Sequence, residues 1–183
     1  MKRALILLAD GFEQTEALTT QDVLLRTHEA EVTLASISKS LVVESSSLLH
    51  VQANALLEDL DLNGFDFLIL PGGKRGVENL KASKKVIEAI RFFKEKGKHV
   101  HAICAAPSIL GELGYLDGLD YTCFPGFEKG KGHYQDEGAV ICQETVTGHS
   151  MYYTIAFAEK IVELELGKEA LERTYPGTRG IRS

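Results

Sequence analysis

Short apolar runs alternate with longer amphipathic stretches along most of this chain. The runs cover residues 3–9, 32–36, 65–70, 99–103 and 140–147, the last with a break near Gln143. Each run has the length of a buried strand and is bounded by turn-forming residues. Strands that alternate with helices are typical of βαβ units, so the pattern predicts an α/β fold built on a mostly parallel sheet.

The stretches between the runs carry apolar residues at helical spacing. This spacing predicts helices over residues 13–27, 84–95, 105–116 and 152–166. Gly114 or Gly118 is expected to end the third helix and Gly167 the fourth, because glycine favours the backbone conformation that terminates a helix. Residues 41–52 alternate poorly and are interpreted as an irregular hairpin beside the sheet. Both faces of the sheet would be covered by helices.

Length and charge narrow the class of protein. The 183 residues make one domain, over residues 1–183, at roughly 150 residues per domain. Lys and Arg number 20 against 26 Asp and Glu, a net charge of −6, which argues against nucleic acid or an anionic membrane as the main partner. A small-molecule ligand is expected instead. The first apolar run is too short for a secretion signal or a membrane span, so a cytoplasmic location is expected.

The cysteines do not form a recognisable disulfide or zinc motif. There are three of them, an odd number without a C-x-x-C pair, which is typical of a reducing compartment. Cys123 and Cys142 lie on or near predicted strands and are interpreted as buried packing residues. His99 and His101 share one strand face, but no third ligand has recognisable spacing, so no metal is expected. Phosphate-loop and dinucleotide fingerprints are missing too, and no cofactor is predicted.

Cys104 occupies a different kind of position, between a predicted strand and a predicted helix. Its neighbours Ala102, Ala105 and Ala106 are small, which suits a sharp strand-to-helix turn around an exposed nucleophile. At a helix N-terminus, free backbone N–H groups and the helix dipole would lower the pKa of the thiol. The layout favours a nucleophilic, oxidisable cysteine. Spacing alone leaves open a buried packing cysteine.

A glycine pair, Gly72 and Gly73, follows the predicted strand at residues 65–70. Ligands bind at this carboxyl edge of an open α/β sheet. Glycine also allows close backbone approach, as in an oxyanion site. A plain tight turn is the alternative interpretation.

Four motifs occur in order along the chain. They are residues 2–5 leading into Glu13-Gln14-Thr15-Glu16, then Leu70-Pro71-Gly72-Gly73, then Ala102-Ile103-Cys104-Ala105-Ala106-Pro107, and finally Ile161-Val162-Glu163. Together they resemble the DJ-1/PfpI (ThiJ) superfamily, on its DJ-1-like branch. The resemblance implies a three-layer α/β/α sandwich of the flavodoxin-like or class I glutamine amidotransferase-like type.

The resemblance also implies a site. Cys104 would be the nucleophilic and redox-active cysteine, and Glu16 the carboxyl that touches it. Gly72 and Gly73 would be backbone donors facing the sulfur, with the Ala105 N–H as a further donor. A carboxyl beside a thiolate in a half-buried pocket has a raised pKa, so Glu16 could stay protonated and pass a proton.

Two functions follow from the resemblance. The first is a glutathione-independent glyoxalase III or a deglycase, acting on small reactive carbonyl compounds. The alternative is an oxidative-stress sensor or redox-regulated chaperone that works through oxidation of Cys104 to a sulfinate. Relatives of this branch are generally homodimers, and a homodimer is expected, with the first helix and residues 41–52 as the expected contributors. A thiamine-related role is not supported, because the sequence shows no residues that would bind a phosphate group.

The chain departs from the superfamily pattern at three places. Ala105 replaces the histidine that follows the cysteine in PfpI-type proteases, so protease activity is not expected. Phe124 stands where many DJ-1-like members have a histidine, and residues 150–153 replace a Gly-Pro-Gly-Thr turn with a bulkier segment. Phe124 and His149 are therefore candidate pocket-wall residues. His149 could act as a substitute acid or base, or it could be an ordinary solvated loop residue.

Overall fold

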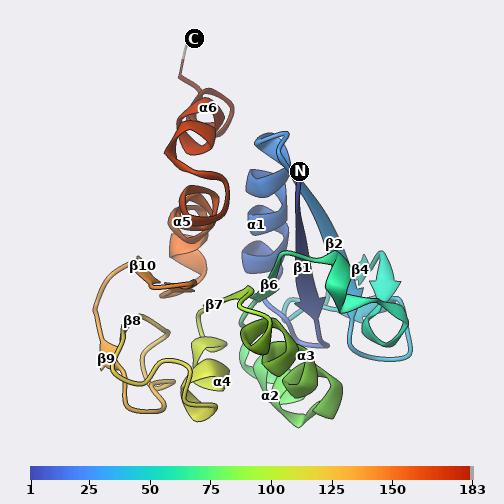
Figure 1. Cartoon of the computed structure of the whole chain (residues 1–183). Coiled ribbons are helices and arrows are strands. Elements are labelled where there is room, and N and C mark those ends of the chain that lie inside the picture. The colour runs from blue at the N-terminus through green and yellow to red at the C-terminus, as the bar shows by residue number, and fades with distance from the viewer. Residues whose placement is uncertain (182–183) are drawn as a thin grey trace.

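A seven-stranded sheet forms the centre of the fold (Figure 1), in a computed structural model that describes residues 1–181. In spatial order the strands are β10 (Ala139–Cys142), β11 (Thr145–Gly148), β7 (His99–Ile103), β6 (Phe67–Leu70), β1 (Lys2–Leu8), β2 (Ala30–Ser36) and β5 (Ala55–Leu56). Only β10 and β11 pair antiparallel; the other neighbours in this sheet are parallel. The order β2-β1-β6-β7-β11 is that of a flavodoxin-like sheet.

Helices cover both faces of this sheet and make three layers, as predicted. One face carries α1 (Gln14–Arg26), α5 (Thr154–Leu166) and α6 (Lys168–Arg179), and the other carries α2 (Lys74–Ala82), α3 (Lys84–Glu95) and α4 (Pro107–Glu112). Strand β1 shows the division, because Leu5 and Leu7 pack into one buried cluster while Ile6 and Leu8 pack into the other. This alternation follows from the two-residue period of a strand.

Several predicted bounds are confirmed. Strand β7 and helix α3 have the predicted bounds, and Ser83 caps α3 by accepting from the Val86 N–H at 3.4 Å. Helix α1 begins at Gln14 because the Glu13 carboxylate accepts from the Glu16 N–H at 2.8 Å. The irregular hairpin forms from β3 (Val42–Glu44) and β4 (His50–Gln52).

Other elements differ from the predictions. The apolar run at residues 140–147 is a tight hairpin, with Gln143 in the left-handed region at φ 52°. Helix α4 covers only half of the predicted stretch, and a 3₁₀ turn at Met151–Tyr153 precedes α5. Helices α2 and α6 were not predicted.

The remaining elements are short. They are β8 (Asp120–Tyr121), β9 (His133–Tyr134) and the 3₁₀ turns at Leu57–Asp59 and Leu62–Gly64. Within residues 1–181, none of the helices has both the length and the apolar character needed to cross a bilayer.

Candidate active site

Cys104 lies directly after β7, at the carboxyl end of the sheet, where the sequence predicted a sharp turn. Its φ of 64° is in the left-handed region, which is uncommon for a residue other than glycine, asparagine or aspartate. Two hydrogen bonds hold it there: the Cys104 N–H donates to the Gly148 carbonyl, and the Cys104 carbonyl accepts from the Phe124 N–H, both at 2.8 Å. The surrounding fold therefore maintains a strained backbone at this cysteine, as is common at functional sites.

Glu16 reaches the same place from the first turn of α1. Its side chain is buried, and its Oε2 accepts from the Gly72 N–H at 2.6 Å. No residue in the described part of the chain gives Oε1 a hydrogen bond of good geometry. Burial raises the pKa of Glu16 to about 7, although the Gly72 N–H works in the opposite direction. This carboxyl is consequently able to gain or lose a proton near neutral pH.

Gly72 separates the carboxyl from the cysteine. A Cβ at this position would lie 2.6 Å from the Cys104 Cβ and 2.7 Å from Glu16 Oε2. Both groups thus flank the same backbone atom, and no larger residue fits between them. The Gly72 N–H is engaged by Glu16, so it does not face the sulfur as the sequence predicted.

The backbone N–H groups of Gly73 and Ala105 lower the pKa of the Cys104 thiol, against the larger effect of burial. Gly73 has φ 86° and directly precedes α2, and a Cβ there would lie 2.4 Å from the Gly11 carbonyl oxygen. Glycine is required for this conformation. These two donors would also face an oxyanion formed next to the sulfur.

The thiol itself does not titrate as predicted. Burial, followed by the negative charge of Glu16, raises the pKa of Cys104 to about 12. The predicted lowering relied on a long helix starting beside the cysteine, whereas α4 starts at Pro107 and has six residues. Cys104 and Glu16 therefore act as one unit that gives up its first proton near neutral pH and retains the second into the alkaline range. Protonation of Glu16 removes the negative charge that opposes thiolate formation, while burial still raises the pKa of the thiol.

A small cleft of about 180 Å³ opens over the sulfur. Its lining residues are Lys74, Cys104, Ala105, Phe124 and Phe127. The rings of Phe124 and Phe127 meet edge to face, with centroids 6.3 Å apart. Phe124 was predicted as a wall residue. Lys74 and Phe127 were not, although Lys74 directly follows the glycine pair in sequence.

His149 is absent from this lining. Its Nε2 lies 3.7 Å from Asp136 Oδ1, and its ring packs edge to face on Tyr153 with centroids 5.5 Å apart. Its other ring nitrogen, Nδ1, is buried without a hydrogen-bond partner among the described residues. The structure thus places His149 against the segment at Met151–Tyr153.

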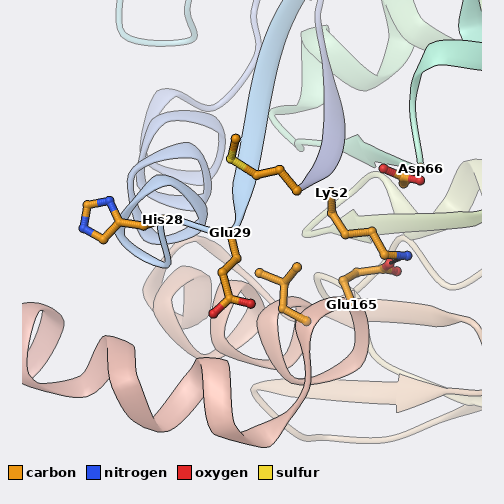
Figure 2. Close-up of a pocket in the computed structure, with 7 residues that line it drawn as sticks. Lys2, His28, Glu29, Asp66 and Glu165 are labelled. Atoms are coloured by element: carbon orange, nitrogen blue, oxygen red, sulfur yellow. Dashed lines mark ion pairs between the residues drawn. The ribbon is translucent and has the colours of Figure 1, made fainter.

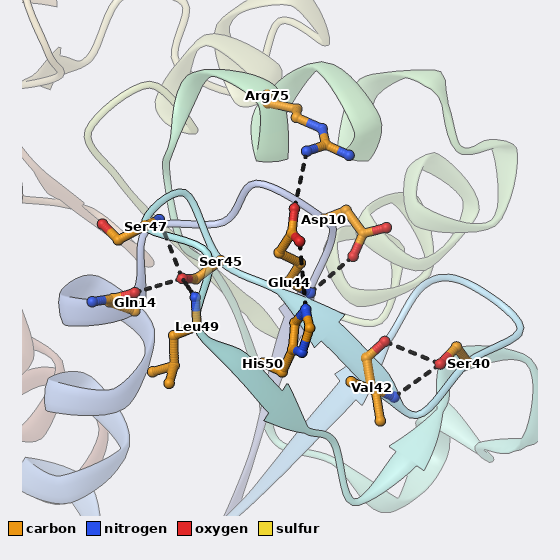
Figure 3. Close-up of polar contacts among 10 residues, drawn as sticks. All are labelled: Asp10, Gln14, Ser40, Val42, Glu44, Ser45, Ser47, Leu49, His50 and Arg75. Atoms are coloured by element: carbon orange, nitrogen blue, oxygen red, sulfur yellow. Dashed lines mark hydrogen bonds and ion pairs between the residues drawn. The ribbon is translucent and has the colours of Figure 1, made fainter.

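The hairpin β3–β4 fixes the loop that carries α1 into the site (Figure 3). The Ser45 hydroxyl donates to Gln14 Oε1 at 2.5 Å, and the Glu44 N–H donates to Asp10 Oδ1 at 3.0 Å. Arg75, in the first turn of α2, pairs with Glu44 at 3.4 Å. These contacts fix the positions of the N-terminal ends of α1 and α2 relative to each other, and therefore the position of Glu16.

A larger, open depression of about 640 Å³ lies at the opposite end of the sheet (Figure 2). It is lined by Met1, Lys2, His28, Glu29, Asp66, Glu165 and Leu166. The lining holds charged groups but no cysteine or serine. Size alone does not mark the reactive site in this molecule.

A buried cluster beside this cavity supplies the third partner that the sequence did not reveal for the two strand histidines. Glu165 Oε1, from α5, lies 2.5 Å from His99 Nδ1 and 3.1 Å from His101 Nε2. The three groups are close enough together to surround a metal ion. However, His101 Nδ1 accepts from the Val146 N–H at 3.0 Å, so its Nε2 carries the hydrogen and donates to Glu165. His101 then has no free lone pair for a metal.

Cys123 and Cys142 are buried, as predicted. Burial raises the pKa of the Cys123 thiol to about 12 and that of the Cys142 thiol to about 11. Cys142 also donates to the Thr145 carbonyl at 3.3 Å. Cys104 differs from both because it is only partly buried and lines a cleft, which leaves it as the reactive candidate.

The similarity to known proteins covers nearly the whole chain. A profile of the DJ-1/PfpI family matches residues 2–164. The Parkinson disease protein 7 homolog of Danio rerio is 32% identical over 174 residues, 92% of each chain. The chain therefore belongs to the DJ-1/PfpI family, and its relatives place it on the DJ-1-like branch.

Two further relatives differ in extent and in name. Protein DJ-1 homolog B of Arabidopsis thaliana is 32% identical over 168 residues, which are 90% of this chain and 38% of that protein. This chain thus spans well under half the length of that relative. A protein of Pyrococcus abyssi named as a deglycase is 32% identical over 126 residues, 69% of this chain and 74% of that protein.

Solved structures agree on the fold. A mutant of a DJ-1 superfamily protein from Salmonella typhimurium superposes with a TM-score of 0.91 at 29% identity, over the full length of both chains. Oxidised Toxoplasma gondii DJ-1 gives a TM-score of 0.87 at 27% identity, over 97% of each chain. The three-layer α/β/α architecture is shared.

Proposed function

We propose that this protein converts small reactive carbonyl compounds, such as methylglyoxal, to hydroxy acids without glutathione. The observation that carries the proposal is the pairing of a strained, cleft-lining Cys104 with a buried Glu16 whose pKa is raised to about 7. A thiolate is the nucleophile that adds to an aldehyde, and a carboxyl that titrates near neutral pH transfers protons in both directions. Family membership and the name of the Pyrococcus relative support carbonyl chemistry of this kind.

The reaction balances without an external oxidant. The Cys104 sulfur adds to the aldehyde carbon of methylglyoxal, and the aldehyde oxygen takes a proton from Glu16, which gives a hemithioacetal. The Glu16 carboxylate then removes the hydrogen of that carbon as a proton and returns it to the neighbouring ketone carbon through an enediol. The aldehyde carbon is thereby oxidised to a thioester while the ketone is reduced to an alcohol. Water hydrolyses the thioester, and lactate and the thiol are released.

The backbone supports the steps that build negative charge on oxygen. The N–H groups of Gly73 and Ala105, which lower the pKa of the Cys104 thiol, would stabilise the oxygen that becomes an alkoxide when the sulfur adds. A deglycase reaction would use the same start, with a glycated amine or thiol as the leaving group. The apolar walls formed by Phe124 and Phe127 favour a small substrate.

Lactate formation from methylglyoxal in glutathione-free buffer tests the proposal. Wild-type protein is expected to produce lactate, and Cys104→Ser to fall to the uncatalysed rate. Cys142→Ser is the matched control, because it changes a buried thiol far from the cleft, and it should retain turnover. Equal turnover by Cys104→Ser and wild type would contradict the mechanism.

A sensor role is the second candidate. The favouring observation is the unpartnered Oε1 of Glu16 beside a sulfur whose thiol pKa the backbone N–H groups of Gly73 and Ala105 lower, because a protonated carboxyl can donate to a sulfinate oxygen. Two equivalents of hydrogen peroxide would each transfer one oxygen to the sulfur and leave as water. Intact mass after mild peroxide should show two added oxygens on wild type and none at this site in Cys104→Ser. Unselective oxidation of all three cysteines would count against it.

We further propose a homodimer formed through the hairpin β3–β4. This hairpin exposes four large apolar side chains, Leu41, Val42, Leu48 and Leu49, and a patch of this kind on a small protein supports association. Sedimentation should show a dimer for wild type and a monomer for Leu48→Asp. Ile155→Asp, at an exposed position on α5, is the control expected to remain dimeric. A wild-type monomer would refute the proposal.

A further inference from the structure

Lys74 is the only charged side chain in the lining of the Cys104 cleft. The remaining walls are the sulfur, the Ala105 methyl group and two phenylalanine rings. The Lys74 side chain is exposed to solvent at the rim of this cleft. Water therefore screens its charge, but the ammonium is the positive group that an anion entering this apolar cleft would meet.

The position of Lys74 is unfavourable for the fold alone. It is the first residue of α2, and the first turn of that helix contains no acidic residue. The dipole disfavours a cation at a helix N-terminus. Arg75, the next residue, is compensated by Glu44 at 3.4 Å, whereas no carboxylate of residues 1–181 pairs with Lys74 within 4.0 Å. Residues that are locally unfavourable for the fold and have no compensating contact are found mainly at functional sites.

From this geometry we infer that Lys74 selects carbonyl compounds that carry a carboxylate, with glyoxylate as the simplest example. The inference rests on the proposed function and names its substrate class. An aldehyde joined to a carboxylate can place its carbonyl carbon at the Cys104 sulfur and its negative charge towards the ammonium. The same contact would hold the carboxylate of a hydroxy-acid product.

Alkylation of Cys104 tests the inference independently of any turnover. Iodoacetate and iodoacetamide both form a carbon–sulfur bond with loss of iodide, and they differ mainly in the negative charge of iodoacetate. The ratio of their rates cancels the thiolate fraction. Lys74→Met is expected to lower the iodoacetate-to-iodoacetamide ratio about fivefold, the effect of one unit charge at about 4 Å in water.

Two variants control the measurement. Lys74→Arg keeps the charge and should keep the ratio, and Lys84→Met removes a lysine that is 90% exposed at the start of α3 and should not change it. Added salt should lower the wild-type ratio and leave that of Lys74→Met unchanged. As a second readout, glyoxylate should protect Cys104 from iodoacetamide in wild type at lower concentration than in Lys74→Met.

Failure of the inference is distinguishable from failure of the proposed function. An unchanged ratio in folded Lys74→Met overturns the role of Lys74, whatever the lactate assay gives. If the ratio falls as expected but the protein makes no lactate, Lys74 selects anions at the cleft and the proposed reaction is wrong.

Discussion

The two ends of the sheet each bury a glutamate, and the two carboxyl groups titrate in opposite directions. At the carboxyl end, Glu16 receives one backbone N–H, and burial raises its pKa to about 7. At the amino end, Glu165 is also buried, yet its pKa lies below the usual range because hydrogen bonds and charge from His101 and His99 outweigh burial. Lys2 adds a charge 3.7 Å from its second oxygen.

The difference teaches that burial raises the pKa of a carboxyl unless enough donors and positive charges surround it. Glu165 has three positive or donating partners and remains an anion, so it ties α5 to β7 and β1. Glu16 has one donor and a thiol, so it keeps a mobile proton near neutral pH. The first arrangement stabilises structure, and the second supports proton transfer.

Replacing Glu16 or Glu165 by glutamine should distinguish proton transfer from structural stabilisation, and the largest difference is expected in the rate of turnover. Glu16→Gln removes the proton carrier, and lactate formation is expected to fall roughly 10²- to 10⁴-fold, the range for a lost general acid–base group. Glu165→Gln, if folded, should stay within about twofold of wild type, because its contacts lie at the other end of the sheet. Steady-state kinetics on both variants decide this, and comparable losses would show that Glu16 has no special role.

For stability, we expect the substitution at Glu165 to have the larger effect. Glu165→Gln should lower the free energy of unfolding by about 3 kcal/mol, because it removes the buried charge that His99 and His101 face. Urea unfolding at constant m-value measures the loss. Glu163→Gln, on the same helix in a pair with Lys168 at 3.8 Å, is the control and should change stability by less than about 0.5 kcal/mol. A loss no greater than that of the control would mean that the cluster stabilises nothing.

The contribution of Glu16 to the pH dependence of stability can be isolated by comparing wild type with Glu16→Gln. Its folded pKa of about 7 exceeds the reference value of 4.5, so the unfolded chain ionises first, and stability is lost as pH rises through this window. The wild-type free energy of unfolding, relative to that of Glu16→Gln, should therefore fall by about 2–3 kcal/mol from pH 5 to pH 8. Parallel urea titrations of the two proteins test the sign, and a constant difference between them would place the carboxyl pKa near its ordinary value.

For Glu165 we expect the opposite pH dependence of stability, in the acid range. Its lowered pKa contributes stability that is present above the reference value of 4.5 and is lost as pH falls through the folded pKa. The advantage of wild type over Glu165→Gln should therefore shrink below pH 4.5. Acid unfolding curves for this pair of proteins complete the comparison between the two ends.

A smaller effect tests the packing between Glu16 and Cys104. Gly72→Ala places a methyl group where it collides with both, and we expect a loss of about 1–3 kcal/mol in stability together with a loss of turnover. Gly177→Ala is the matched control, since a Cβ there meets only one atom, at 3.9 Å, in helix α6. It should be neutral or stabilising by up to about 1 kcal/mol. Thermal unfolding and lactate assays read out both variants, and wild-type behaviour of Gly72→Ala would refute the close approach.

Local pattern was sufficient to predict the layers of the fold and the turn at Cys104. Strand and helix periods are local properties, and small residues around Cys104 signal a sharp turn within a few positions. The break near Gln143 was predicted, but the antiparallel hairpin at residues 139–148 was not, because its turn lacks the glycine or asparagine that usually marks one. Helix α2 was not predicted because it is short and has Gly76 in its first turn, where glycine weakens a helical pattern.

The parts that required the structure are contacts between residues distant in sequence. Glu165 joins His99 and His101 across more than 60 positions, so no spacing rule connects them. Glu16 entered through family resemblance, and its link to Gly72 spans 56 positions. The pKa of Cys104 depends on burial and on Glu16 together, which a helix-terminus argument omits.

The most direct test is the carboxyl titration itself, followed by NMR on protein labelled with ¹³C at the glutamate carboxyl carbons. Glu16→Gln and Glu165→Gln assign the two resonances by their disappearance. The account predicts that the Glu16 signal titrates near pH 7, while the Glu165 signal stays that of an anion down to below pH 4.5. A Glu16 signal that titrates at or below 4.5 would contradict a proton shared between Glu16 and Cys104.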